Sequence, residues 1–150
     1  MSVPRALSAE AVTPGMDLGP VVFGPLERAD ITRYAHASGD LNPIHLDDER
    51  ARAAGAPSVF AMGLLPAGHL AHALCDWVGG PQRLRRLRVR FTARVWPGDE
   101  VVCRGRVDSL RGDVVTVALE ARRRGPGPEG LDLPPEEVAL VGEAEARLTG

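Results

Sequence analysis

The sequence predicts an α+β domain in which one antiparallel sheet wraps around a buried helix. Three features of the chain indicate this class. Helical patterns come first, the second half consists mainly of strand patterns, and the stretch 53–75 between them has no charged residue. A helix that is apolar nearly all round is typical of a central, buried position. Consecutive strands joined by short turns favour an antiparallel meander, so a single sheet would cover the helix.

Length and composition agree with one domain. The chain has 150 residues, of which 44% are hydrophobic and 25% charged, an ordinary balance for a globular protein. Aromatic residues make up only 4%, so the core must be built mainly from Ala, Val and Leu. We therefore expect residues 1–150 to form one domain, with an irregular N-terminal arm at 1–19 and a flexible, Gly- and Pro-rich loop at 125–137.

Charge and cysteine content exclude several classes of function. All 18 basic residues are Arg, which rules out a Schiff-base lysine and a P-loop lysine. The net charge of −2 and the few aromatics argue against nucleic-acid and membrane partners. Cys75 and Cys103 form neither a disulfide framework nor a zinc cluster. Residues 1–10 lack the pattern of a signal peptide, so the cytoplasm is the expected compartment.

Turn formers and caps divide the first half of the chain into short elements. In the second of two short helices, acidic residues stand near the start and Arg near the end, an order that the helix dipole favours. Gly, Asn and Pro between the two helices indicate a loop. The expected elements are a strand at 21–23, a helix from 27 or 30 to 37, a loop at 38–43 and a helix at 47–54.

The stretch 63–78 is the strongest helix candidate. Pro66 falls in its first turn, where a missing backbone N–H costs nothing. Gly79, Gly80 and Pro81 end it. A membrane span over 53–75 is the alternative, but its glycines, prolines and histidines are residues that a lipid-facing helix carries reluctantly.

Period-two patterns predict four further strands. In the first, residues 86–95, apolar residues alternate with Arg, giving one apolar and one cationic face. The others are 100–110, 114–124 and 138–148. The arginines between Arg83 and Arg94 have two interpretations. They hold phosphates of coenzyme A or meet an acidic carrier protein, or they form a solvated face paired with Glu120, Glu143 or Glu145. We favour the second.

The segment 34–45 carries the strongest chemical signal. Asp40 and His45 are five residues apart across a loop with Gly, Asn and Pro, which can turn both side chains towards one point. A carboxylate beside an imidazole is a general acid–base pair. The structural alternative is that Asp40 makes an Asx turn and His45 caps the following helix.

This segment resembles the signature of the MaoC-like hydratase/dehydratase family, the (R)-specific enoyl thioester hydratases. The matching residues are Tyr34, Ser38-Gly39-Asp40, Asn42-Pro43-Ile44-His45 and Ala51. Three later segments of the sequence also match the family signature, in the same order: Ala61–Gly68, Val89–Ala93 and Pro97–Asp99. The resemblance covers about Ala29 to Val107. It implies a hot-dog fold, a sheet wrapped around a long helix, which is usually dimeric.

The resemblance also implies a reaction and the roles of residues. The chain would interconvert (3R)-hydroxyacyl and trans-2-enoyl thioesters, with Asp40 and His45 as the catalytic pair and Asn42 orienting the loop or the water. Gly63, at the start of the buried helix, would offer its unpaired N–H to the developing enolate. Its alternative role is only that of a helix N-cap. Met62 and Leu64 flank it as substrate-binding residues, where the family commonly has His-Gly-Met.

The resemblance implies partners as well. They are a coenzyme A or acyl carrier protein thioester in fatty acid metabolism and a second copy of the chain, with a heterodimer as the alternative. No metal or redox cofactor is expected. Two other functions stay open: a hot-dog thioesterase and a non-catalytic subunit of a heterodimeric dehydratase. A metal site on His69, His72, Cys75 and Asp76 is less favoured than packing or polar contacts at a subunit interface.

Overall fold

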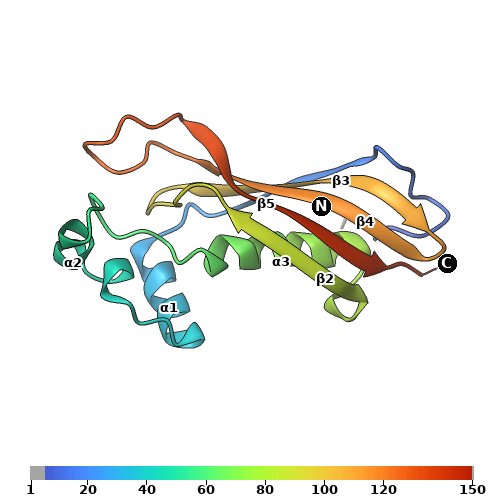
Figure 1. Ribbon diagram of the computed structural model, residues 1–150, viewed down its shortest axis with the longest axis horizontal. Helices are drawn as coiled ribbons and strands as arrows, with labels where there is room; N and C mark the ends of the chain where they lie inside the picture. Colours follow the sequence, from blue (N-terminus) through green and yellow to red (C-terminus); the bar gives the residue numbers. More distant parts are fainter. Residues whose placement is uncertain (1–5, 150) are drawn as a thin grey trace.

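A five-stranded antiparallel sheet lies across a central helix in the computed structural model, which describes residues 6–149 (Figure 1). The strands are β1 (Asp17–Phe23), β2 (Leu84–Phe91), β3 (Glu100–Arg111), β4 (Val114–Arg124) and β5 (Glu136–Arg147), in the order β1-β3-β4-β5-β2. The central helix is α3 (Leu64–Val78). This architecture confirms the predicted α+β class. Residues 1–5 of the expected N-terminal arm lie outside the described residues.

Short helices gather at one end of the sheet, near the start of α3 (Figure 1). They are α1 (Arg28–Ser38), the 3-10 helix η1 (Pro43–His45) and α2 (Asp48–Ala53). The boundaries of α1 and α2 agree with the prediction because local caps set them. Asp47 Oδ1 accepts from the N–H of Glu49 at 2.8 Å. Gly39 ends α1 in the left-handed conformation, with φ 78°.

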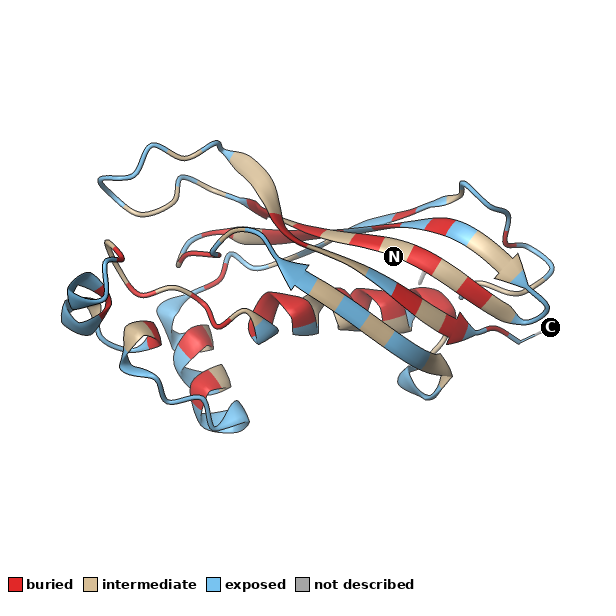
Figure 2. Cartoon of the chain, in the orientation of Figure 1, coloured by how far each residue is buried: buried red, intermediate tan, exposed pale blue. Residues whose placement is uncertain are grey.

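The core lies between α3 and the sheet (Figure 2). On β4 the inward side chains alternate regularly with outward ones, and the helix packs small and aliphatic side chains onto them. Gly105 of β3 shows how closely helix and sheet approach, since a Cβ built there would lie 3.0 Å from Cζ3 of Trp77. A core poor in aromatics therefore suits a slim helix held against a sheet.

The N-terminal strand starts earlier than expected. Asp17 and Leu18 pair with Arg106 and Gly105 of β3, so the last residues of the expected irregular arm are strand. The rest of the arm also packs on the body of the protein. Leu7 donates its N–H to the carbonyl of Trp77 at 2.7 Å, and Val12 is buried.

Boundaries later in the chain also differ from the prediction. β2 ends at Phe91 rather than at Val95. The N–H groups of Thr92 and Ala93 both point to the carbonyl of Ala139, at 2.8 and 3.2 Å, and this interrupts the regular ladder. The loop expected at 125–137 is two residues shorter, because Glu136 already pairs with Arg124 as the start of β5.

The arginines of β2 lie on an exposed face of the sheet. The register places Arg86 opposite Glu145 and Arg88 opposite Glu143. Arg86 Nη1 lies 4.0 Å from Glu145 Oε1. For Arg86 the favoured interpretation, a solvated face paired with a glutamate, is confirmed, and the register places Arg88 where it could pair in the same way.

No helix among residues 6–149 combines the length and the apolar character that crossing a membrane requires. The uncharged stretch 53–75 instead contributes the approach loop and most of α3.

Candidate active site

His45 is held by a backbone carbonyl. Its Nδ1 lies 2.7 Å from the carbonyl oxygen of Phe60, and its ring meets the Phe60 ring edge-on. A carbonyl oxygen only accepts, so Nδ1 must carry the proton of this hydrogen bond. In the neutral imidazole, Nε2 is then the acceptor.

Nε2 of His45 has no hydrogen-bond partner within residues 6–149. In that part of the chain, the side-chain nitrogens and oxygens that are both buried and unpartnered are His69 Nδ1 and Arg83 Nε. Nε2 of His45 is therefore not enclosed, although the whole side chain is only 8% exposed. The ring is thus held at Nδ1, whereas Nε2 makes no hydrogen bond within the described chain.

Asp40 lies in the exposed turn between α1 and η1. Its Oδ1 accepts a long hydrogen bond, 3.4 Å, from the N–H of Asn42, as an Asx turn requires. Asn42 in turn accepts from Ile44 and caps η1, so it orients the loop. The alternative role of His45 as a helix cap is wrong, because Asp47 caps α2. Within the described chain, no hydrogen bond or ion pair joins Asp40 to His45.

Asp48 fastens the loop to the segment that leads into α3. Its Oδ1 accepts from the N–H of Val59 at 2.9 Å, and Arg28 Nη2 donates to Oδ2 at 2.9 Å. The N–H of Val59, followed by the Arg28 guanidinium, lowers the pKa of the Asp48 carboxyl. This clamp positions the Phe60 carbonyl that holds His45. The sequence gives little sign of it, because an acid at a helix start is ordinary.

Asp48→Asn is expected to destabilise the protein by about 1 kcal/mol at neutral pH. A carboxyl whose pKa is lower in the folded state stabilises the fold above its unfolded pKa, near 4, and loses this effect as the pH falls through the folded pKa. The difference between variant and wild type should therefore shrink on acidification. Urea unfolding at pH 7 and at pH 3 measures it. Glu49→Gln, a neighbouring exposed acid, is the control, and a difference independent of pH would contradict the assignment.

Gly63 begins α3. Its backbone is helical, with φ −56°, and its N–H has no acceptor among the described residues. It lies at the positive end of the helix dipole. The flanking side chains differ in surroundings: Met62 is packed in the main core at 2% exposure, whereas Leu64 is 61% exposed.

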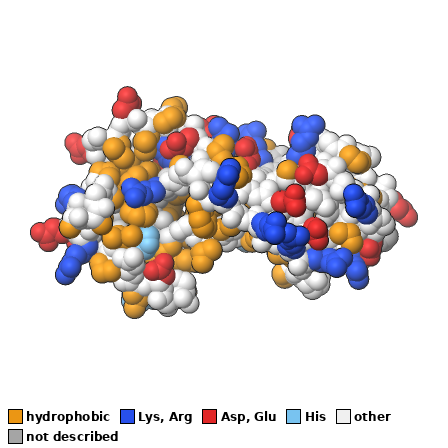
Figure 3. Space-filling model, viewed as in Figure 1, with side chains coloured by type: hydrophobic (Ala, Val, Ile, Leu, Met, Phe, Trp, Pro, Cys, Tyr) orange, Lys and Arg blue, Asp and Glu red, His pale blue; other side chains and the backbone are white. Residues whose placement is uncertain are grey.

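Exposed apolar side chains accompany these residues. Leu41 follows Asp40, Leu46 follows His45, and Leu64 follows Gly63. All three are exposed, as is Phe91. Figure 3 shows hydrophobic side chains gathered on the half of the molecule that carries α1 and α2, whereas charged side chains are denser on the other half. Each of the residues predicted for catalysis is thus followed in the chain by an exposed leucine.

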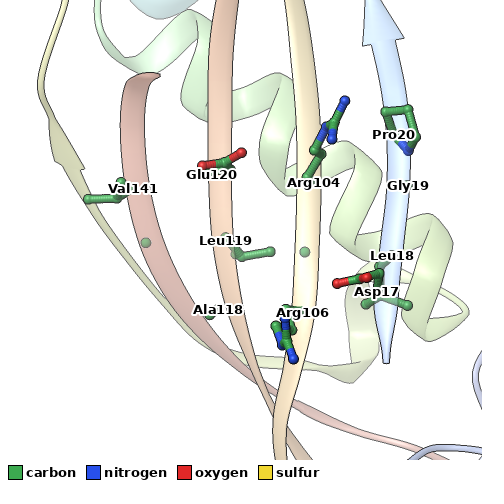
Figure 4. A pocket seen from close by; sticks show the side chains of 12 residues that line it. Asp17, Leu18, Gly19, Pro20, Arg104, Arg106, Ala118, Leu119, Glu120 and Val141 are labelled. Atoms are coloured by element: carbon green, nitrogen blue, oxygen red, sulfur yellow. The ribbon is translucent and has the colours of Figure 1, made fainter. Parts of the chain in front are cut away.

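A hollow on the sheet lies apart from these residues. It has a volume of about 740 Å³ and is formed by strands β1, β3, β4 and β5 (Figure 4). Arg104, Arg106, Glu120 and Val141 are among its lining residues, and it contains none of the residues predicted for catalysis. Its position places it apart from the Asp40–His45 loop.

The two histidines of α3 contact other side chains of the fold. His69 stacks on Phe23 with ring centroids 4.7 Å apart, and burial lowers its pKa. His72 Nε2 lies 3.5 Å from Asp76 Oδ2. Nowhere in residues 6–149 do three His, Cys, Asp or Glu side chains group as metal ligands would. Burial raises the pKa of the Cys103 thiol to about 12, so it stays protonated and is a poor nucleophile.

Comparison with known proteins identifies relatives. The chain is 37% identical over 73 residues to a probable enoyl-CoA hydratase 2 of Dictyostelium discoideum, a match that covers 45% of this chain and 24% of the relative. The chain thus spans about a quarter of that protein's length.

Solved structures share the fold. A MaoC-like dehydratase has a TM-score of 0.83 and 28% identity, over 97% of this chain and 43% of that one. An (R)-hydratase from A. caviae has a TM-score of 0.76 and 22% identity, over 93% of this chain and 98% of that one. These likenesses confirm the predicted hot-dog fold. The model of the MaoC like domain matches residues 9–121, most of the chain. The chain therefore belongs to the MaoC-like domain family.

Proposed function

We propose that this protein reversibly adds water to a trans-2-enoyl thioester, giving a (3R)-hydroxyacyl thioester. The observation that carries the proposal is the hydrogen bond between His45 Nδ1 and the Phe60 carbonyl, which leaves Nε2 as a proton acceptor. The carboxylate of Asp40 and the unpaired N–H of Gly63 are the other two protein groups that the proposed reaction uses. The relationship to a probable enoyl-CoA hydratase supports the same reaction.

The chemistry needs three protein groups. The water oxygen bonds to Cβ while the electrons of the double bond move towards the thioester oxygen, and a proton then arrives at Cα. Asp40 and His45 divide the two proton transfers, one from the water and one to Cα. The N–H of Gly63 donates to the thioester oxygen as its negative charge develops, an interaction whose loss typically costs about 2.7–4 kcal/mol.

The surroundings of the site suit an acyl chain. Leu41, Leu46, Leu64 and Phe91 offer apolar contacts to an aliphatic substrate carried by coenzyme A or by a carrier protein. Hydrophobic side chains gather more widely on this half of the molecule (Figure 3), and we propose that a second copy of the chain covers those that the substrate does not contact. The reaction proceeds without a metal or redox cofactor, and we propose the cytoplasm as its compartment.

The direct test uses the purified protein with crotonyl-CoA and with longer trans-2-enoyl-CoAs. We expect loss of the enoyl absorbance and, by chiral chromatography, a (3R)-hydroxyacyl product. Release of free thiol, detected with a thiol reagent, would instead indicate a thioesterase. Absence of turnover alone, with activity restored by a related chain, would favour a non-catalytic subunit and contradict the proposal.

A further inference from the structure

Phe91 is the last residue of the edge strand β2. It pairs with Leu140 of β5, and cross-strand partners lie on the same face of a sheet. Leu140 is completely buried against the core, so Phe91 also lies on the face that carries α3. Phe91 nevertheless remains 50% exposed, since no strand follows on its other side. Half of an aromatic side chain is thus available to a ligand.

The ring of Phe91 lies directly against Gly63. A Cβ built on Gly63 would be 2.9 Å from Cε1, 3.0 Å from Cζ and 3.1 Å from Cδ1 of that ring. The backbone of Gly63 is helical, a conformation that any residue adopts, so a glycine is not needed there for its φ angle. The space is limiting instead: Phe91 fills the volume that a side chain would take. The residue that offers the free N–H is therefore also the residue that the aromatic ring covers.

We propose that Phe91 is a specificity-determining residue, whose ring forms the wall of the acyl site beside the N–H of Gly63. This inference rests on the proposed function. A thioester oxygen bound at that N–H places the carbonyl carbon, Cα and Cβ within a few bonds of it. The ring then faces the chain near Cα. A straight enoyl chain packs along the ring, whereas a methyl branch on Cα competes with it for space.

The test compares crotonyl-CoA with its 2-methyl analogue, tiglyl-CoA. Discrimination by one methyl group in an apolar site amounts to about 10–200-fold. We expect Phe91→Ala to raise the ratio of kcat/KM for tiglyl-CoA to that for crotonyl-CoA by at least about tenfold, with Phe91→Leu in between. The KM for crotonyl-CoA should rise in Phe91→Ala, because the chain loses an apolar contact. Melting temperatures of both variants show whether the fold is retained, as expected for a half-exposed side chain.

Val22→Ala is the matched control, since Val22 is 43% exposed on the other edge strand, β1. In this variant, the ratio of kcat/KM for tiglyl-CoA to that for crotonyl-CoA should equal the wild-type ratio. A wild-type protein without activity on crotonyl-CoA would overturn the proposed function and this inference together. An active wild type whose ratio is unchanged in both Phe91 variants would overturn the role of Phe91 alone.

Discussion

Replacing Asp40 with Asn or His45 with Gln is expected to lower the hydratase kcat by about 10²–10⁴-fold, the usual contribution of a positioned acid or base. Asn at position 40 keeps an oxygen that can accept from the N–H of Asn42, so the turn is preserved. It removes the carboxylate to which we assign one of the two proton transfers. The folded structure should therefore remain intact while the reaction slows.

For His45 too, the substitution should slow the reaction and leave the fold intact. The amide of Gln can donate to the Phe60 carbonyl, as Nδ1 does now, but it offers no nitrogen that takes up a proton. Initial rates with crotonyl-CoA give kcat, and thermal unfolding gives stability. His36→Gln is the control, because His36 is an exposed histidine on α1. Turnover at the wild-type rate in both Asp40→Asn and His45→Gln would show that the pair is not catalytic.

Local chemistry explains what the sequence predicted well. The ends of α1 and α2 follow from Gly39 and Asp47, whose effect depends only on neighbouring backbone groups. The Asp40–His45 loop is equally local. The group that fixes the His45 tautomer is instead a backbone carbonyl, at Phe60, and every residue has one. Residue types therefore give no sign of it.

Strand patterns leave position in the sheet undetermined. The alternation over 86–95 predicts an apolar face, but it does not tell that β2 is an edge strand, and so it does not foresee the exposure of Phe91. For Arg123, by contrast, the sequence pattern did indicate a buried ion pair. Arg123 continues the inward series of Val115, Val117, Leu119 and Ala121 on β4, and a charge at such a position needs a buried partner.

That partner is Asp99, and Arg123→Ala is expected to destabilise the protein by about 3–5 kcal/mol. Both side chains are 0% exposed. Arg123 Nε lies 2.7 Å from Asp99 Oδ2, and Nη2 lies 2.9 Å from Oδ1. The hydrogen bond with Asp99 raises the pKa of the guanidinium, which stays charged. Truncation would leave the Asp99 carboxylate buried without its counter-charge.

The neighbouring residue supplies a matched control. Arg124 Nη2 lies 2.9 Å from Glu100 Oε2, a similar contact between side chains that are 43% and 35% exposed. Because water already solvates this pair, Arg124→Ala should cost about 0–1 kcal/mol. Urea denaturation of both variants measures the free energies of unfolding. Equal effects of the two substitutions would contradict the assignment of Arg123 as a buried anchor.

The Asp99–Arg123 pair also connects stability to the site. Asp99 accepts from the N–H of Trp96 at 2.9 Å, and the Trp96 ring packs edge-on against Phe60, whose carbonyl holds His45. Loss of the anchor should therefore loosen Phe60 before the protein unfolds. We expect Arg123→Ala, measured well below its melting temperature, to show a lower kcat with crotonyl-CoA than Arg124→Ala. A destabilised but fully active Arg123→Ala would show that the anchor supports the fold without positioning His45.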